Sequence, residues 1–480
     1  MKRYSFIVFL FACQLLCAQG YQVTLQAPQY KSGIAYLTYH MGKNLNVQDS
    51  AAISNNGSAV FKGKEKLPGG IYAIVFPSKR LSLDFFVDKE QKINIKITDT
   101  SNLLAKSVVT GSTENNLYVQ YQQYVAVKGK QLQDERAAYN VSISSKDSAL
   151  HEANYNKFNK ELNDYRDILI KKQPKSMMAA LLNAMHETMV PNPKPVTRQD
   201  SLSNYTFYKK HYWDGISFMD ERIIRTPFFL PKLERYYREV VSQVPDSIIK
   251  EADYELLLAR SCPEMYKYLL NWLTDEYINP KYMGQDAVFV HLFENYHSKG
   301  ISNWLNEGQM KIINRRAYML MSNLVGEKAA DLEMLDTAGK TSRLYDVNAD
   351  YTLVVFWDPN CGHCKEQIPQ IDSIYNASWK KYKLKVYAVL SPDTETNDKI
   401  KGEWVKFIQE HNLADWTNVY ETAAMDAANN AAQKPSYRQL YDVTLTPTIY
   451  LLDKEKRIIG KKLTWQQLDE LIQVKIKTKG

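Results

Sequence analysis

The segment from Tyr351 to Cys364 constrains the fold of this chain more than any other. Its first seven residues, YTLVVFW, form a continuous β-prone run, which predicts a strand buried on both faces of a sheet. Two cysteines, Cys361 and Cys364, follow after a three-residue turn. Apolar residues then recur at helical spacing, which predicts a helix from Cys361 to about Lys381 with one buried face: Ile368, Ile371, Tyr375 and Trp379.

Strands and helices continue to alternate after this segment. The pattern predicts a second buried strand, a helix, a third strand and a closing helix, in that order: 384–390, 403–411, 448–452 and 465–474. A βαβ unit followed by a helix, a strand and a helix is typical of an α/β sheet. We therefore expect residues 326–480 to form an α/β domain.

The residues ahead of this domain predict two further modules, so the fold class is multidomain. Residues 20–112 hold short alternating strands separated by turn signals such as Asn55-Asn56-Gly57, which predicts an antiparallel β-sandwich. Residues 113–325 change to helical periodicity, which predicts a central all-α region. Within it, the polar segment 131–148 is expected to be an exposed connection or a weak helix, and the proline-rich segment 191–195 a loop.

Residues 1–19 are expected to be a signal peptide. Lys2 and Arg3 precede the apolar run FIVFLFACQLL, which is shorter than the roughly 20 residues needed to span a bilayer. The mature protein is therefore expected in the periplasm or cell envelope, with peripheral or no membrane association. A lipoprotein is the alternative, because the four residues ending at Cys13 loosely resemble a lipobox.

Charge and cysteine content argue against several other classes. The formal charge of +8 is scattered and forms no basic stripe with interleaved aromatics, so we expect no nucleic-acid partner. Of the five cysteines, Cys13 and Cys17 fall in the signal, and the three that remain are too few for a disulfide framework. We expect no cofactor and no metal, since a structural zinc site needs four ligands and no second cysteine pair follows.

The pair Cys361-Gly362-His363-Cys364 predicts thiol chemistry. The partial positive charge and free N–H groups of a helix N-terminus favour a thiolate, so Cys361 is the predicted nucleophile. Cys364 lies one turn further in and is expected to be more buried, where it can resolve a mixed disulfide. A protonated His363 would further stabilise the thiolate, which makes the disulfide form more oxidising.

Several motifs together make residues 326–480 resemble the thioredoxin superfamily, specifically its TlpA/ResA-like envelope branch. They are WDPNCGHC, Pro369 in the following helix, the Thr446-Pro447 pair and the lead-in from Gly326 to Gly339. The resemblance implies an exported thiol–disulfide oxidoreductase acting as a protein-disulfide reductase, with protein or peptide thiols and disulfides as partners. It further implies an upstream membrane electron donor.

The resemblance also assigns roles to individual residues. In that family the proline corresponding to Pro447 forms a cis peptide bond and faces the dithiol, which presents the Thr446 backbone to an extended substrate peptide. We therefore expect Trp357, Thr446 and Pro447 to bind substrate, and Cys361, Cys364 and His363 to be catalytic.

The sequence departs from the family where a buried proton acceptor is expected. Many thioredoxins carry an Asp six residues before the first cysteine, and Val355 stands there; related envelope reductases carry a Glu where Gln367 stands. Glu366 is adjacent but points about 100° away on a helix. With His363, these departures leave the direction open between reduction and an oxidase or isomerase using the same dithiol.

Two further alternatives come from other classes. A peroxiredoxin shares the fold, but that family carries a Thr where Asp358 stands. An envelope binding or scaffold protein with a minor redox domain is the second alternative, because most of the chain lies outside residues 326–480. The front two thirds are similar to uncharacterised modules found ahead of such domains, on the cues Pro68–Tyr72 and His211–Asp214.

Overall fold

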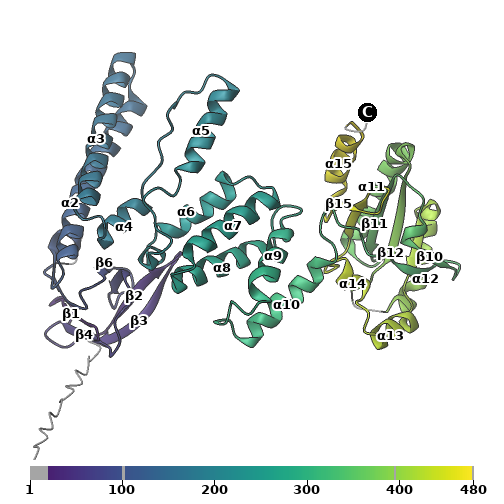
Figure 1. The fold of residues 1–480 in the computed structure, drawn as a ribbon, viewed down its shortest axis with the longest axis horizontal. Helices are drawn as coiled ribbons and strands as arrows, with labels where there is room; N and C mark the ends of the chain where they lie inside the picture. The colour runs from purple at the N-terminus through teal and green to yellow at the C-terminus, as the bar shows by residue number, and fades with distance from the viewer. Residues whose placement is uncertain (1–19, 100–102, 394–395, 478–480) are drawn as a thin grey trace, which may run out of the picture. The chain divides into compact units, whose positions relative to one another are not determined.

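The structure is a computed structural model that describes residues 20–99, 103–393 and 396–477. The expected signal peptide, residues 1–19, lies outside the described residues. N-terminal sheets, a central helical region and a C-terminal sheet with helices follow one another along the chain (Figure 1), which confirms the expected fold class. The chain divides into two compact units, and the division passes through the helical region: the first unit comprises residues 1–241 and 257–268, the second 242–256 and 269–480.

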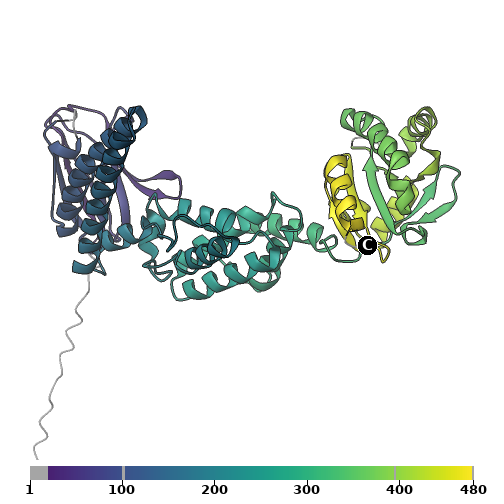
Figure 2. The same cartoon turned by 90° about the horizontal axis from the view of Figure 1, so that it is seen from above.

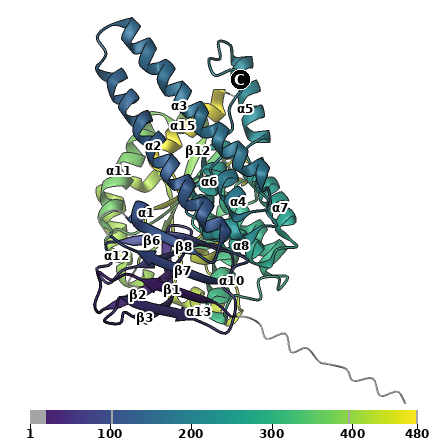
Figure 3. The same cartoon turned by 90° about the vertical axis from the view of Figure 1, so that its left-hand side faces the viewer.

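Strands within residues 20–99 and 103–112 form two four-stranded sheets (Figure 3). One contains β4 (Ser58–Lys62), β1 (Gln22–Gln26), β7 (Lys92–Ile97) and β8 (Ser107–Thr110), in that order. The other contains β3 (Asn44–Ala52), β2 (Ile34–Met41), β5 (Gly70–Val75) and β6 (Ser82–Val87), in that order. Alternate residues of both sheets meet in one apolar core, as a sandwich requires.

One strand pair of this sandwich differs from the antiparallel expectation. Strands β1 and β7 run parallel, and the other pairs described in these two sheets are antiparallel. Parallel neighbours need a crossover connection rather than a hairpin. The chain supplies it here, because between β1 and β7 it passes through the strands of the other sheet.

Helix α2 (Thr113–Val141) closes the free edge of strand β6. Asn115 is fully buried, and its side chain donates to the carbonyl of Phe86 (2.8 Å) and accepts from the Phe86 N–H (2.7 Å). The ring of Tyr118 stacks on that of Phe86, with centroids 4.2 Å apart. Helix α2 continues into a long hairpin with α3 (Ser145–Lys172), so most of the polar segment 131–148 is helical.

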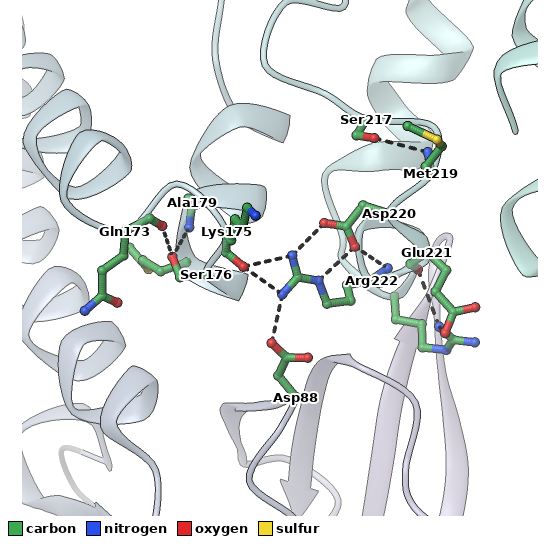
Figure 4. Close-up of polar contacts among 12 residues, drawn as sticks. Asp88, Gln173, Lys175, Ser176, Ala179, Ser217, Met219, Asp220, Glu221 and Arg222 are labelled. Carbon is green, nitrogen blue, oxygen red and sulfur yellow. Dashed lines mark hydrogen bonds and ion pairs between the residues drawn. The ribbon is translucent and has the colours of Figure 1, made fainter. Parts of the chain in front are cut away.

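Arg222 joins the sandwich to the helices of the first unit (Figure 4). Its Nη1 donates to Asp88 just after β6 (2.8 Å), and its Nε and Nη2 donate to the two oxygens of Asp220 (2.8 and 2.7 Å). The carbonyl of Lys175 lies 3.4 Å from both terminal nitrogens. The planar guanidinium can serve three segments at once because its donors point in fixed, divergent directions.

The remaining helices of the front part are short. They are α1 (Leu103–Lys106), α4 (Met177–Ala184), α5 (Arg198–Lys210), α6 (Phe229–Arg235), α7 (Pro245–Ala259), α8 (Pro263–Tyr277), α9 (Asp286–Leu292) and α10 (Glu307–Met321). The apolar face of α8 is buried at Met265, Leu269 and Leu273, and residues 191–195 form the predicted loop. No helix within the described ranges is both long and apolar enough to cross a membrane.

The described part of residues 326–477 contains a seven-stranded mixed sheet. Its strands, in spatial order, are β10 (Thr341–Arg343), β9 (Glu333–Asp336), β13 (Thr417–Tyr420), β12 (Leu384–Leu390), β11 (Tyr351–Trp357), β14 (Thr448–Leu452) and β15 (Ile458–Lys461). The three predicted strands are confirmed as β11, β12 and β14. Strands β9, β10, β13 and β15 were not predicted, because each has only three or four residues.

Helices cover both faces of this sheet. They are α11 (Gly362–Ala377), α12 (Asn397–Glu410), α13 (Ala423–Ala431), α14 (Tyr437–Leu440) and α15 (Trp465–Lys477), the last drawn in yellow in Figure 2. Helices α11, α12 and α15 pack on the face that holds Leu353 and Val355. Helix α14 packs on the other face, which holds Val354 and Phe356. Strand β11 is therefore buried on both sides, as its composition predicts.

We predict that His297 makes the second unit sensitive to acid. Its ring is 2% exposed between the hydroxyls of Thr274 and Ser302, both 2.8 Å away, and burial lowers its pKa to about 4. Between that pKa and the unfolded value of 6.5, the unfolded chain binds a proton that the folded chain does not, so stability falls as pH falls through this window. By pH 4 the expected loss is about 3 kcal/mol.

Urea unfolding of wild type and His297→Gln at neutral and acid pH measures this loss. The difference in free energy of unfolding between the two proteins should shift in favour of the variant as the pH is lowered. An equal pH dependence in both proteins would contradict the prediction.

Candidate active site

The two cysteines lie at the start of helix α11, directly after the central strand. Cys361 is the N-cap residue and is half-buried, whereas Cys364 is fully buried in the core beneath it. Asp358 shapes the intervening turn, because its carbonyl accepts from the Cys361 N–H (3.1 Å) and its carboxylate from the Asn360 N–H (2.8 Å). Both sulfurs are free thiols in the described structure.

A cis peptide bond faces the outer sulfur. The bond between Thr446 and Pro447 is cis, which confirms that expectation. The Cys361 thiol donates to the Thr446 carbonyl, with sulfur and oxygen 3.3 Å apart. Strand pairing brings the segments together, because β14 runs antiparallel to β11 with Phe356 opposite Thr448. The residues just before β14 therefore lie beside the turn that follows β11.

The inner thiol is held in its protonated form. Burial raises the pKa of Cys364 well above its ordinary value, and the nearby Cys361 raises it further. A backbone group of Asp358 and the hydroxyl of Thr446 act in the opposite direction without cancelling the effect of burial. That hydroxyl is buried and has no hydrogen-bond partner assigned within the described residues. The two sulfurs therefore differ in access to solvent, and burial makes the proton of Cys364 harder to remove.

Neither position at which the family carries a buried proton acceptor holds a carboxylate in this chain. Val355 is fully buried in β11, Gln367 is half-buried on α11, and Glu366 is exposed. Because an exposed Glu366 faces water, it is poorly placed to take a proton from the buried Cys364. Thr446 is the polar side chain that the structure brings to this thiol, and its position 82 residues downstream of Cys364 is why sequence spacing alone did not indicate it.

Two of the predicted site residues, His363 and Trp357, differ in their exposure to solvent. His363 is exposed on the first turn of α11, beside Cys361. Trp357 is 0% exposed and packs against Phe407 with ring centroids 5.1 Å apart, so in this structure it offers no surface for the substrate contact that was expected of it. The physical reason is that β11 is buried on both faces up to its last residue. Trp357 belongs instead to the buried apolar cluster that also contains Cys364.

A further contact was not foreseen from the sequence. The side chain of Asn360, just before Cys361, donates to the carboxylate of Glu403 on α12 (2.7 Å). This bond fixes the outer side of the turn that carries the nucleophile. Its signal in the sequence is only the Asn itself, because the partner lies 43 residues further along.

Family models match two parts of the chain. Residues 21–118 match a domain of unknown function, DUF4369, and residues 325–461 match the AhpC/TSA family. The first match extends past the last strand of the sandwich to Tyr118, and so includes Asn115 at the edge of β6. No curated protein matches the chain.

Several solved bacterial structures are similar to this chain. A thioredoxin-like protein from Bacteroides caccae is 24% identical and covers 60% of this chain and 98% of its own, with a TM-score of 0.45. A domain of a possible thiol-disulfide isomerase from Cytophaga hutchinsonii is 34% identical over 32% of this chain and 96% of its own, with a TM-score of 0.26. The thioredoxin domain of a thiol-disulfide oxidoreductase from Bacteroides vulgatus is 26% identical and covers 31% of this chain and 95% of its own, with a TM-score of 0.26.

The family match and the strand–turn–helix placement of the dithiol lead to one conclusion. The C-terminal part of this chain is a thioredoxin-like domain of the AhpC/TSA family, and residues 21–118 belong to an N-terminal domain of unknown function.

Proposed function

We propose that this protein is an exported thiol–disulfide oxidoreductase that reduces protein or peptide disulfides by dithiol exchange. The observation that carries the proposal is the arrangement of the two sulfurs. Cys361 is accessible at a helix N-terminus and faces the carbonyl before a cis proline, while Cys364 is buried one turn below. An accessible thiol with a buried partner suits attack followed by resolution.

The first step uses Cys361 as the nucleophile. Its thiolate attacks one sulfur of the substrate disulfide, which forms a mixed disulfide and releases the other substrate sulfur as a thiolate that takes up a proton. The free N–H groups of the first turn of α11 stabilise the thiolate before attack. The Thr446 carbonyl, 3.3 Å from the sulfur, is placed to accept from the backbone of a bound peptide once the Cys361 thiol no longer occupies it.

The second step uses Cys364. It loses its proton, attacks the Cys361 sulfur and releases the second substrate thiol, so two electrons pass to the substrate and a Cys361–Cys364 disulfide remains. Burial opposes this proton loss, which keeps Cys364 from competing as a nucleophile before the mixed disulfide forms. An upstream membrane electron donor would return the pair to the dithiol form. The direction of net electron flow depends on the potential of this pair.

We predict that the two cysteines fail in different ways when each is replaced. Cys361→Ser should abolish reduction of a model peptide disulfide with dithiothreitol as donor, because no accessible thiolate remains. Cys364→Ser should instead accumulate a mixed disulfide at Cys361, visible by mass spectrometry as the added mass of the peptide. Cys262→Ser is the matched control, since this buried cysteine lies outside the domain and should leave turnover unchanged. Wild-type turnover by Cys361→Ser would refute the assignment of the nucleophile.

We predict that release of the substrate from the mixed disulfide accelerates with pH. Because burial raises the pKa of Cys364, its thiolate is a minor species that grows about tenfold per pH unit until the pH reaches that pKa. Loading Cys361 with a chromogenic thiol and following its release at several pH values measures the effect. A release rate that is flat from about pH 6 to pH 9 would show that Cys364 does not resolve the intermediate through its thiolate.

We predict that the Cys361–Cys364 pair is found mainly as a dithiol in the cell envelope if reduction is the physiological direction. Trapping the thiols with an alkylating reagent that adds mass, directly after acid quenching of cells, measures the resting state. A pair trapped as the disulfide in growing cells would favour the oxidase alternative, because an oxidant must be stored in its oxidised form, whereas reduction and isomerisation both begin with a free thiolate.

A further inference from the structure

A buried carboxylate lies just ahead of the cis-proline segment. Asp442 is 0% exposed; its Oδ1 accepts from Nη1 of Arg316 (2.7 Å), and its Oδ2 lies 2.5 Å from Nζ of Lys462. A carboxylate withdrawn from water is stable only with such charged partners. Arg316 belongs to helix α10 and Lys462 follows strand β15, so three segments of the second unit meet at this side chain.

Asp442 also fixes the backbone that leads to the active site. Its φ is +46°, in the left-handed region that Asp and Asn enter more readily than other non-glycine residues. The next N–H, of Val443, donates to the carbonyl of Arg438 (2.8 Å), which closes the turn. Three residues separate Asp442 from Thr446, the residue whose carbonyl faces Cys361. A shift of the carboxylate therefore moves that carbonyl.

The far end of the same segment is also anchored to Lys462. The backbone N–H of Lys462 donates to the carbonyl of Ile449 in β14 (2.7 Å). Between the two anchors, the Thr448 hydroxyl donates to the carbonyl of Leu445 (2.6 Å). The chain from Asp442 to Ile449, which contains the cis bond, is thus tied at both ends to one lysine.

The segment after helix α10 makes a second set of contacts to this region. Asn323 is fully buried, and its side chain donates to the carbonyl of Leu440 (3.0 Å). Its own carbonyl and side-chain oxygen accept from Nζ of Lys461 (2.8 and 3.0 Å), which also pairs with the buried carboxylate of Asp286 on α9. Two adjacent lysines, Lys461 and Lys462, therefore connect the helices ahead of the thioredoxin-like domain to the cis-proline segment.

We propose that Arg316 and Asn323 are positioning residues that hold Thr446 and Pro447 in place, Arg316 through Asp442 and Asn323 through Leu440. The inference rests on the proposed function and extends it. Residues 325–461 match the family model, and helix α10, which lies before them, would also help to set the docking of the peptide. Arg316 contacts neither sulfur in the described structure. Its removal should weaken the docking of a substrate peptide. Because a displaced Thr446 carbonyl no longer accepts from the Cys361 thiol, the change should not make Cys361 less nucleophilic.

The surroundings of Arg316 allow this to be tested without unfolding the domain. A cavity of about 540 Å³ is lined by Arg316, Asp442 and Lys462 among other residues, so water can reach the carboxylate when the guanidinium is removed. Lys462 remains as a counter-charge in such a variant. We therefore expect Arg316→Met to fold with a displaced turn at Asp442.

The test compares Arg316→Met with Arg315→Met in the full chain. Arg315 is the exposed neighbour on α10, so its replacement removes the same charge without touching Asp442. We expect KM for a peptide disulfide to rise about tenfold in Arg316→Met with kcat little changed, and to stay at the wild-type value in Arg315→Met. The rate at which iodoacetamide alkylates Cys361 should not fall in either variant. Arg316→Lys should recover part of the lost affinity.

Two results would overturn the positioning role of Arg316, and a third would overturn the proposed function. An unchanged KM in Arg316→Met, with wild type turning over, overturns the positioning role; so does a matching drop in alkylation rate, because the residue would then act on the thiolate. Failure of both wild type and Arg315→Met to reduce any peptide disulfide overturns the proposed function itself. If Arg316→Met loses its near-ultraviolet circular dichroism, Asp442→Asn decides by the same readouts, since Asn tolerates the left-handed φ and removes only the charge.

Discussion

Burial of strand β11 on both faces is the constraint on which the site depends. Each of its seven side chains is buried, so the strand has one register and one length, and the chain must leave the sheet at Asp358. The turn capped by that aspartate then begins helix α11 at Cys361. A dithiol on a surface loop would have many geometries. Here a packed core fixes the accessible sulfur at the helix N-terminus and the second sulfur below it.

The same core separates the properties of two chemically identical thiols. Cys364 is surrounded by apolar side chains, which disfavour its anion, whereas Cys361 faces the helix N-terminus and the Thr446 carbonyl. The order of attack and resolution follows from this difference in burial rather than from a dedicated base. Positions 355 and 367 carry no carboxylate, which is consistent with such a site. The hydroxyl of Thr446 is the polar side-chain group that the structure brings to the inner thiol.

The helical region supplies contacts that the thioredoxin-like domain lacks by itself. Arg316 and Asn323 lie before the family match, yet they bond to Asp442 and Leu440 in the turn that precedes Pro447. In the first unit, Arg222 binds the sandwich to its helices in a similar way, through a half-buried guanidinium shared among segments far apart in sequence. Charge withdrawn from water is costly unless it is paired, so the loss of one partner from such a contact is strongly destabilising.

The sequence by itself determined the elements whose residues are contiguous. The run 351–357, the helix carrying the dithiol, the strands 384–390 and 448–452 and the cis bond at Pro447 were all predictable, because each depends on local periodicity or on a motif. The short strands β9, β10, β13 and β15 were not, since three or four residues carry too little pattern, and the parallel pairing of β1 with β7 depends on a crossover. Only the tertiary structure decided that Trp357 is fully buried in the core, and that Arg316 reaches Asp442 across 126 residues. Burial and long-range ion pairing are properties of segments packed together, and a linear pattern does not encode which segments will meet.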